Sequence, residues 1–143
     1  LEKVSLENEI EAIEQYIKLQ LLKSLASENI DFYKEGDFSQ KEIVPLLFLS
    51  LVENCFKHGN INNSENAWIK ISLIHENDTL YFTTENSFDN MINPIFKKEN
   101  SNIGNQNIER QLTLNYPNIH HLAIEKNDTF YETKIELFLP KTN

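Results

Sequence analysis

One segment, residues 45–58, is apolar almost all round when it is read as a helix. Its apolar residues include Leu46, Leu47, Phe48, Leu49, Leu51 and Val52. A helix that is hydrophobic on every side needs other elements to cover it, so this one is expected to be deeply buried. Pro45 is expected to open the helix, because the first helical position needs no N–H group. Gly59 is a natural stop.

The same segment ends in polar residues, which is unusual for a buried helix. Asn54 and His58 are four residues apart and therefore share one helical face, with Glu53 and Lys57 beside them. A helix end with these side chains is equipped to hold a metal ion and phosphates. The alternative is that Glu53 and His58 make solvated contacts at the helix end, where the helix dipole favours a histidine.

The remaining chain alternates between helical and strand patterns. An amphipathic helix is expected from Ser5, its N-cap, to about Ser24, and a third helix over 105–116. Strands are expected over 30–34, 68–75, 79–85, 122–126 and 130–139. The order predicts an α/β fold, a two-layer α/β sandwich with a mixed sheet and helices on one face. Residues 87–104 show no period and are either functional or mobile.

Charge and cysteine content limit the partners. The net charge of −9 argues against non-specific binding of nucleic acid, and an anionic nucleotide would need a local positive site or a metal ion. Cys55, the single cysteine, cannot form an internal disulfide, and it is interpreted as a small buried residue in a reducing, cytoplasmic setting. No apolar run reaches the roughly 18 residues that span a membrane. The chain begins with Leu1, so it is interpreted as part of a longer protein whose other segments could include membrane spans.

Three sets of residues resemble LytS/YehU-type sensor histidine kinases, in the order that this family has them. Residues 5–9 and 16–19 resemble the segment that leads into the family's ATPase domain. Residues 44–47 and 51–59 resemble its N-box helix, and the Glu-Asn-x-x-x-His-Gly ending is the most specific part. Residues 103–112 resemble its second, glycine-containing nucleotide motif and the following helix. The resemblance covers nearly the whole chain and implies the Bergerat ATP-binding fold of the GHKL proteins, which gyrase and MutL share.

The resemblance implies roles for the polar end of the second helix. Asn54 would bind ATP through Mg²⁺, as the protein ligand of the metal. Such an ion prefers oxygen ligands and keeps several waters. Glu53 would be catalytic, by orienting a water or accepting a proton during phosphoryl transfer. His58, or Lys57 if the helix end rotates, would approach a phosphate.

The motif that would contact adenine is altered in this chain. Asn86 stands where the family has an Asp that accepts a hydrogen bond from the adenine amino group, although a shift of one residue would place Glu85 there. The glycines that follow this Asp in the family are absent, with Ser87 and Asp89 in the corresponding region. The alternative interpretation is an ordinary turn after a strand.

Gly104 precedes the third helix and could expose backbone N–H groups to phosphates. Arg110 on that helix would reach a phosphate or pair with an acidic side chain. Residues 87–102 would then form the lid over the ATP.

The resemblance implies a function for the chain. Residues 27–143 would be the ATP-binding catalytic domain of a two-component sensor histidine kinase, and residues 1–26 a helix linking it to an upstream dimerisation and phosphoacceptor region. The γ-phosphate would pass to an upstream histidine and then to a response regulator. None of the four histidines of this chain has the phosphoacceptor setting, so no autophosphorylation is expected from it alone.

The parent protein would be a homodimer in the cell membrane, and this domain would lie in the cytoplasm. The alternative is a degenerate, non-catalytic GHKL-like domain that acts as a protein-interaction module through the apolar stripe of its first helix.

Overall fold

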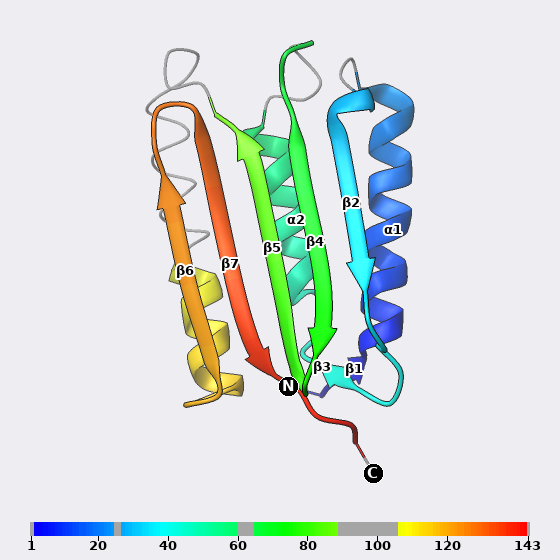
Figure 1. Ribbon diagram of the computed structural model, residues 1–143, viewed down its shortest axis with the longest axis vertical. Helices are drawn as coiled ribbons and strands as arrows, with labels where there is room; N and C mark the ends of the chain where they lie inside the picture. The colour runs from blue at the N-terminus through cyan, green and yellow to red at the C-terminus, as the bar shows by residue number, and fades with distance from the viewer. Residues whose placement is uncertain (1, 25–26, 60–64, 89–105, 143) are drawn as a thin grey trace.

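The computed structural model describes residues 2–24, 27–59, 65–88 and 106–142, which form two layers (Figure 1). One layer is a five-stranded sheet in the order β2-β4-β5-β7-β6. Its strands are β2 (Ile30–Glu35), β4 (Ile69–Glu76), β5 (Thr79–Ser87), β6 (His120–Lys126) and β7 (Phe130–Phe138). β2 pairs with β4 in parallel and the other pairs are antiparallel, so the sheet is mixed.

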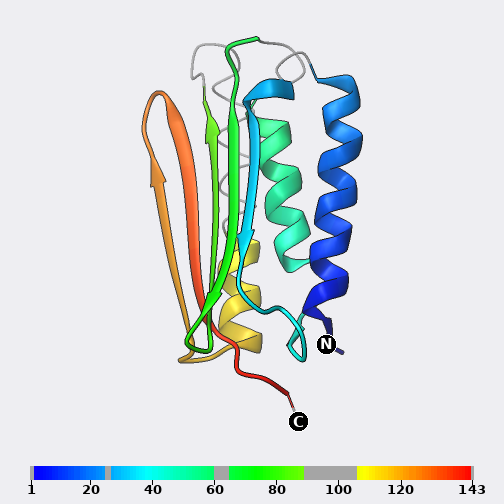
Figure 2. The same cartoon turned by 45° about the vertical axis from the view of Figure 1, so that its right-hand side comes forward.

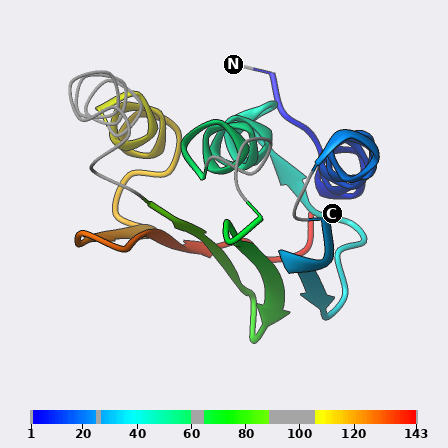
Figure 3. The same cartoon turned by 90° about the horizontal axis from the view of Figure 1, so that it is seen from above.

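The helices of the described residues form the second layer, all on one face of the sheet (Figures 2 and 3). They are α1 (Leu6–Lys23), α2 (Leu47–His58) and a helix that the structure describes over 106–115. Together with the mixed sheet, this arrangement confirms the predicted two-layer α/β fold. A short 3-10 turn, η1 (Ser27–Asn29), leads into β2. No helix among the described residues is long and apolar enough to cross a membrane.

α1 begins and ends where the sequence predicts. The Ser5 hydroxyl accepts a hydrogen bond from the Asn8 N–H at 3.0 Å, which satisfies one of the free donors at the helix start. Ser24 is the C-cap. The apolar stripe of α1 is buried, and one hydrophobic core contains side chains of α1, α2 and the sheet. The proposed division between residues 1–26 and 27–143 stays a prediction.

The start of α2 differs from the expectation for Pro45. Pro45 and Leu46 form a turn, and the helix begins two residues later, at Leu47. Leu46 has a left-handed backbone with φ of 66°, and no side chain of its own segment caps the helix. The cap comes from α1 instead: the Glu9 carboxylate accepts the N–H groups of Leu46, Phe48 and Leu49. A cap that arrives from another element leaves no local sequence signal.

α2 packs on the sheet through a fully buried aromatic pair. The rings of Phe48 and Phe82 stack with their centroids 4.4 Å apart and their planes 24° from parallel. Cys55 is buried on the same side of α2, and burial raises the pKa of its thiol to about 12. This confirms the interpretation of Cys55 as a small buried residue, because a thiol with that pKa stays protonated and unreactive near neutral pH.

Helix 106–115 is anchored from its far end. Ile108, Leu112 and Tyr116, which follow one another at intervals of four residues, are buried. The Tyr116 hydroxyl accepts a hydrogen bond of 2.9 Å from the Val44 N–H, which lies just before the turn into α2. The end of helix 106–115 is therefore tied to the backbone that leads into α2.

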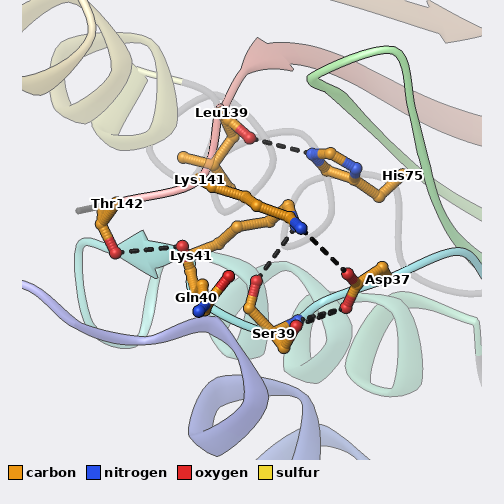
Figure 4. Close-up of polar contacts among 8 residues, drawn as sticks. All are labelled: Asp37, Ser39, Gln40, Lys41, His75, Leu139, Lys141 and Thr142. Carbon is orange, nitrogen blue, oxygen red and sulfur yellow. Dashed lines mark hydrogen bonds and ion pairs between the residues drawn. The ribbon is translucent and has the colours of Figure 1, made fainter.

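The two ends of the described chain meet on the loop before β3. Two short strands, β1 (Val4–Ser5) and β3 (Glu42–Ile43), pair antiparallel, and the Leu6 N–H donates to the Lys41 carbonyl oxygen at 2.9 Å. The tail after β7 crosses the same loop (Figure 4). Thr142 donates its N–H to the Gln40 carbonyl oxygen at 2.7 Å. This loop therefore holds α1 and the C-terminal tail against one end of the sheet.

Candidate functional site

A cavity of about 590 Å³ lies between α2 and helix 106–115. Its apolar end is formed by Pro45, Leu46 and Leu47 at the start of α2. Farther along α2 it is lined by Ser50, Asn54, Lys57 and His58. The opposite wall is formed by Asn107, Ile108, Arg110 and Gln111. The cavity thus runs the length of α2 and becomes polar toward the end of that helix.

The charges that line this cavity are of one sign. Lys57 of α2 and Arg110 of helix 106–115 both line it, one on each wall, and His58 follows Lys57 in the last turn of α2. None of its described lining residues is an Asp or a Glu, although the chain as a whole carries a net charge of −9. The described walls therefore make a local cationic site on an acidic protein, which favours an anionic ligand.

The predicted residues of α2 fall on two different sides of the helix. Asn54 and His58 both line the cavity, as their spacing of one helical turn predicts. Glu53 is exposed and does not line it. Glu53 lies near α1, where its charge adds to the effect of burial in raising the pKa of Tyr16. The structure therefore separates Glu53 from Asn54, and the catalytic role of Glu53 stays a prediction.

The strand register distinguishes the two alternatives for the adenine contact. Asn86 pairs with Ile69 across β4 and β5, and its side chain is on the helix face, only 2% exposed. Glu85 therefore points to the opposite, open face of the sheet. A Cβ atom on Gly59 would lie 3.4 Å from the Asn86 Cβ, so the backbone at the end of α2 packs directly against Asn86. Of the two residues, Asn86 is the one next to the end of α2.

A serine joins α2 to the sheet where the resembling family has a glycine-rich motif. The Ser87 hydroxyl accepts a hydrogen bond of 3.0 Å from the Trp68 N–H and donates one of 3.2 Å to the Gly59 carbonyl oxygen. The Ser87 N–H also donates to the Trp68 carbonyl oxygen at 3.0 Å. The sequence shows this serine but gives no sign that its hydroxyl links the end of α2 to the start of β4.

The predictions for Gly104 and for the lid concern residues whose placement the structure does not describe. Gly104 and the greater part of the expected lid lie outside the described residues. No cluster of three or more His, Cys, Asp or Glu side chains that could hold a metal ion occurs among the described residues. The structure thus brings together Asn54, Lys57, His58 and Arg110, with Asn86 adjacent.

Two carboxylates face each other on the open side of the sheet. Glu85 on β5 lies directly opposite Glu132 on β7, and Glu132 is also opposite Glu125 on β6. Partial burial, then the charge and hydrogen bond of Glu132, raise the pKa of Glu85, although Lys70 and Lys134 oppose this shift. A raised carboxyl pKa means that the folded state holds its proton more tightly than the unfolded state. The pair therefore costs stability at neutral pH, and this cost disappears as the pH falls toward the ordinary glutamate range.

We expect Glu132→Gln to stabilise the fold at pH 7 by a few tenths to about 1 kcal/mol, because like charges directly opposite in a sheet repel. The gain should shrink as the pH falls toward 4, because the Glu85 carboxyl, whose pKa is raised, takes up a proton and the repulsion is lost. Urea unfolding at several pH values measures this difference. Glu136→Gln, an exposed change on the same strand, is the control and should show no such pH dependence. A gain for Glu132→Gln that is equal at pH 4 and pH 7 would contradict the argument.

Comparisons with known proteins identify the fold. No protein-family model matches the chain, and a search of curated proteins finds no match. Solved structures do match, among them several histidine kinases and histidine kinase catalytic domains. The nucleotide-free catalytic domain of histidine kinase ThkA superposes with a TM-score of 0.64 at 16% identity, over 99% of this chain and 98% of that one.

Two further structures agree with this. Histidine kinase AdeS of Acinetobacter baumannii gives a TM-score of 0.56 at 10% identity, over 99% of this chain and 68% of that one. ThkA in complex with the response regulator TrrA gives 0.55 at 18% identity, over 99% of this chain and 42% of that one. The fold of this protein is therefore the one found in the ATP-binding catalytic domain of histidine kinases.

Proposed function

We propose that this protein is the ATP-binding catalytic domain of a two-component sensor histidine kinase of the LytS/YehU type. The observation that carries the proposal is the cavity between α2 and helix 106–115, whose described walls are cationic although the chain is acidic. A triphosphate is the part of a nucleotide that needs such charges, and both Lys57 and Arg110 are placed to contact it. Asn54 lies in the same wall, on the face that the N-box resemblance assigns to the metal.

The reaction we propose is transfer of the ATP γ-phosphate to a histidine outside this chain. Phosphoryl transfer depends mainly on positioning and on stabilising negative charge, and the cavity offers both. The structural neighbours support the assignment because they are described as histidine kinases, one of them bound to its response regulator. We therefore propose a response regulator as the final acceptor. Residues 1–26 would connect to the dimerisation and phosphoacceptor region of a homodimeric, membrane-anchored parent, with this domain in the cytoplasm.

The residues present fit a magnesium ion only if the nucleotide supplies most of its ligands. The described cavity wall offers amide oxygens from Asn54, Asn107 and Gln111 and the hydroxyl oxygen of Ser50, and no carboxylate. Mg²⁺ in such sites is held by one or two protein oxygens together with phosphates and water. Asn54 would be the protein ligand, and the ion would neutralise charge on the β- and γ-phosphates when bound. Asn86 would accept from the adenine amino group through its side-chain oxygen.

A second candidate is a non-catalytic GHKL-like interaction module. The apolar stripe of α1 through which it was expected to act is buried from Leu6 to Ile17, but Leu19 and Leu22 are 61% and 82% exposed although both are apolar. Exposed leucines on one end of a helix can mark a contact with another protein. This alternative requires no nucleotide, so a binding measurement separates the two candidates.

Calorimetric titration with ATP, with and without Mg²⁺, tests the proposal. We expect saturable binding that Mg²⁺ strengthens, and we expect Asn54→Ala to remove this strengthening together with at least about tenfold of the affinity, equal to about 1.4 kcal/mol. Asn8→Ala, an exposed asparagine on α1, is the matched control and should bind like the unmodified protein. If the folded, unmodified protein shows no heat of binding at millimolar ATP, the interaction module is the better hypothesis.

A further inference from the structure

Glu9 on α1 is a buried acid that accepts hydrogen bonds from backbone groups at the start of α2. Its side chain is 3% exposed. One carboxylate oxygen accepts the Leu46 N–H at 3.0 Å, and the other accepts the N–H groups of Phe48 and Leu49, both at 3.2 Å. Hydrogen bonds to an ionised acceptor are stronger than those between neutral groups. Three such bonds from one side chain make Glu9 the cap of a helix to which it does not belong.

The capped backbone also forms the cavity. Leu46 and Leu47 line its apolar end, so the residues held by Glu9 are part of the wall or adjacent to it. Leu46 has a left-handed backbone, which is costly for a leucine and persists only where the surroundings hold it. The N-cap residue of α2 is a leucine with no side-chain hydrogen bond, so the Glu9 carboxylate takes over the capping of these N–H groups.

The opposite wall is tied to the same place. Tyr116 directly follows helix 106–115, and its hydroxyl accepts a buried hydrogen bond from the Val44 N–H. Val44 is two residues before Leu46, so the short stretch from Val44 to Leu49 is bonded both to α1 and to the end of the second wall. A displacement of this stretch would therefore disturb both walls of the cavity.

We propose that Glu9 is a positioning residue for the ATP cavity, through which the docking of α1 sets the place of the α2 wall. The inference rests on the proposed function and adds a residue that the resemblance does not assign to the site. Coupling of this kind is reciprocal. If α1 docking favours the ATP-binding arrangement of the cavity, then ATP in the cavity strengthens the contact between Glu9 and the start of α2.

Hydrogen exchange and nucleotide titration test this on Glu9→Gln. Glutamine keeps the size of the side chain but loses the charge and one acceptor oxygen. We expect faster exchange of the Leu46, Phe48 and Leu49 amides and a loss of ATP affinity on the order of tenfold. In the unmodified protein ATP should slow the exchange of these amides, and in Glu9→Gln this slowing should be much smaller. Glu9→Asp keeps the charge at a shorter reach, and it should give a smaller loss in both measurements.

Two control variants separate positioning from a general loss of stability. Glu11→Gln removes an exposed acid from the same helix and should change neither measurement. Ile10→Ala removes buried packing of α1 but leaves the Glu9 hydrogen bonds in place. At equal loss of stability, Ile10→Ala should retain more ATP affinity than Glu9→Gln.

The outcomes distinguish this inference from the proposed function. If the unmodified protein binds ATP and Glu9→Gln binds it equally well, the positioning role is wrong and the proposed function stands. Equal losses in Glu9→Gln and Ile10→Ala, after matching for stability, would reduce Glu9 to a structural cap. If the unmodified protein does not bind ATP at all, the proposed function fails, and the positioning role falls with it.

Discussion

Replacing Lys57 and Arg110 together by glutamate is expected to weaken ATP binding by 100-fold or more, which is about 2.7 kcal/mol. These two side chains bring positive charge to the cavity from opposite walls. The double change would replace attraction of the triphosphate by repulsion, and like charges across an interface cost several kcal/mol. Both residues are exposed at their helix surfaces, so the fold should remain intact. Calorimetry with ATP and circular dichroism of the unliganded protein measure the two expectations.

A control with the same change in net charge isolates the role of position. Lys18→Glu and Lys23→Glu, made together on the exposed side of α1, alter the net charge by the same amount far along another helix. This control should bind ATP within about threefold of the unmodified protein at physiological salt, where charges more than about 8 Å from the ligand are largely screened. Equal losses in the two double variants would mean that only the overall charge matters and that the cavity is not the site.

Phe82→Ala is expected to be among the most destabilising single changes, at about 3–5 kcal/mol. Phe82 is fully buried in the central strand β5, and its ring stacks on Phe48 of α2. The substitution leaves a cavity between the sheet and the helix that carries Asn54, and it also removes the favourable contact between the rings. Equilibrium unfolding in urea measures the loss, which should appear as a lower midpoint.

Phe138→Ala provides the matched control for this loss. Phe138 is the same residue type, at the end of β7, and its side chain is 47% exposed. Its removal should cost less than about 1 kcal/mol, because a half-exposed ring leaves no buried cavity. If Phe82→Ala were no more costly than Phe138→Ala, the stacked pair would not be a main contact between the two layers.

Hydrophobic period and local capping predicted most of the architecture. The alternation over 68–75 and 79–85 predicted the strands β4 and β5, and Ser5 predicted the start of α1, because both signals are contained within a few neighbouring residues. The start of α2 was misplaced for the opposite reason. Its position depends on Glu9, which is 37 residues away from Leu46 in the sequence. A helix cap supplied over that distance has no local pattern.

The candidate site shows the same division between local and distant information. The spacing of Asn54 and His58 predicted that they share a face, and both line the cavity. That Asn86 rather than Glu85 faces the helices follows from strand register, which the sequence left open. Glu53 and Asn54 are neighbours in the chain and yet lie on different sides of α2, because adjacent residues of a helix point about 100° apart. Whether Glu53 takes part in chemistry is therefore a question for kinetics.

The junction of Trp68, Ser87 and Gly59 has a practical consequence. Trp68 is the only tryptophan in the chain, and its backbone is hydrogen-bonded to the strand end that carries Asn86. Its indole ring is half-buried, with the Lys70 ammonium 5.5 Å from the ring centroid. Unfolding of the β4–β5 hairpin would expose this ring to water and change its environment. The tryptophan fluorescence of the unlabelled protein therefore comes from one known position. The unfolding curves of every variant described above can be recorded with it.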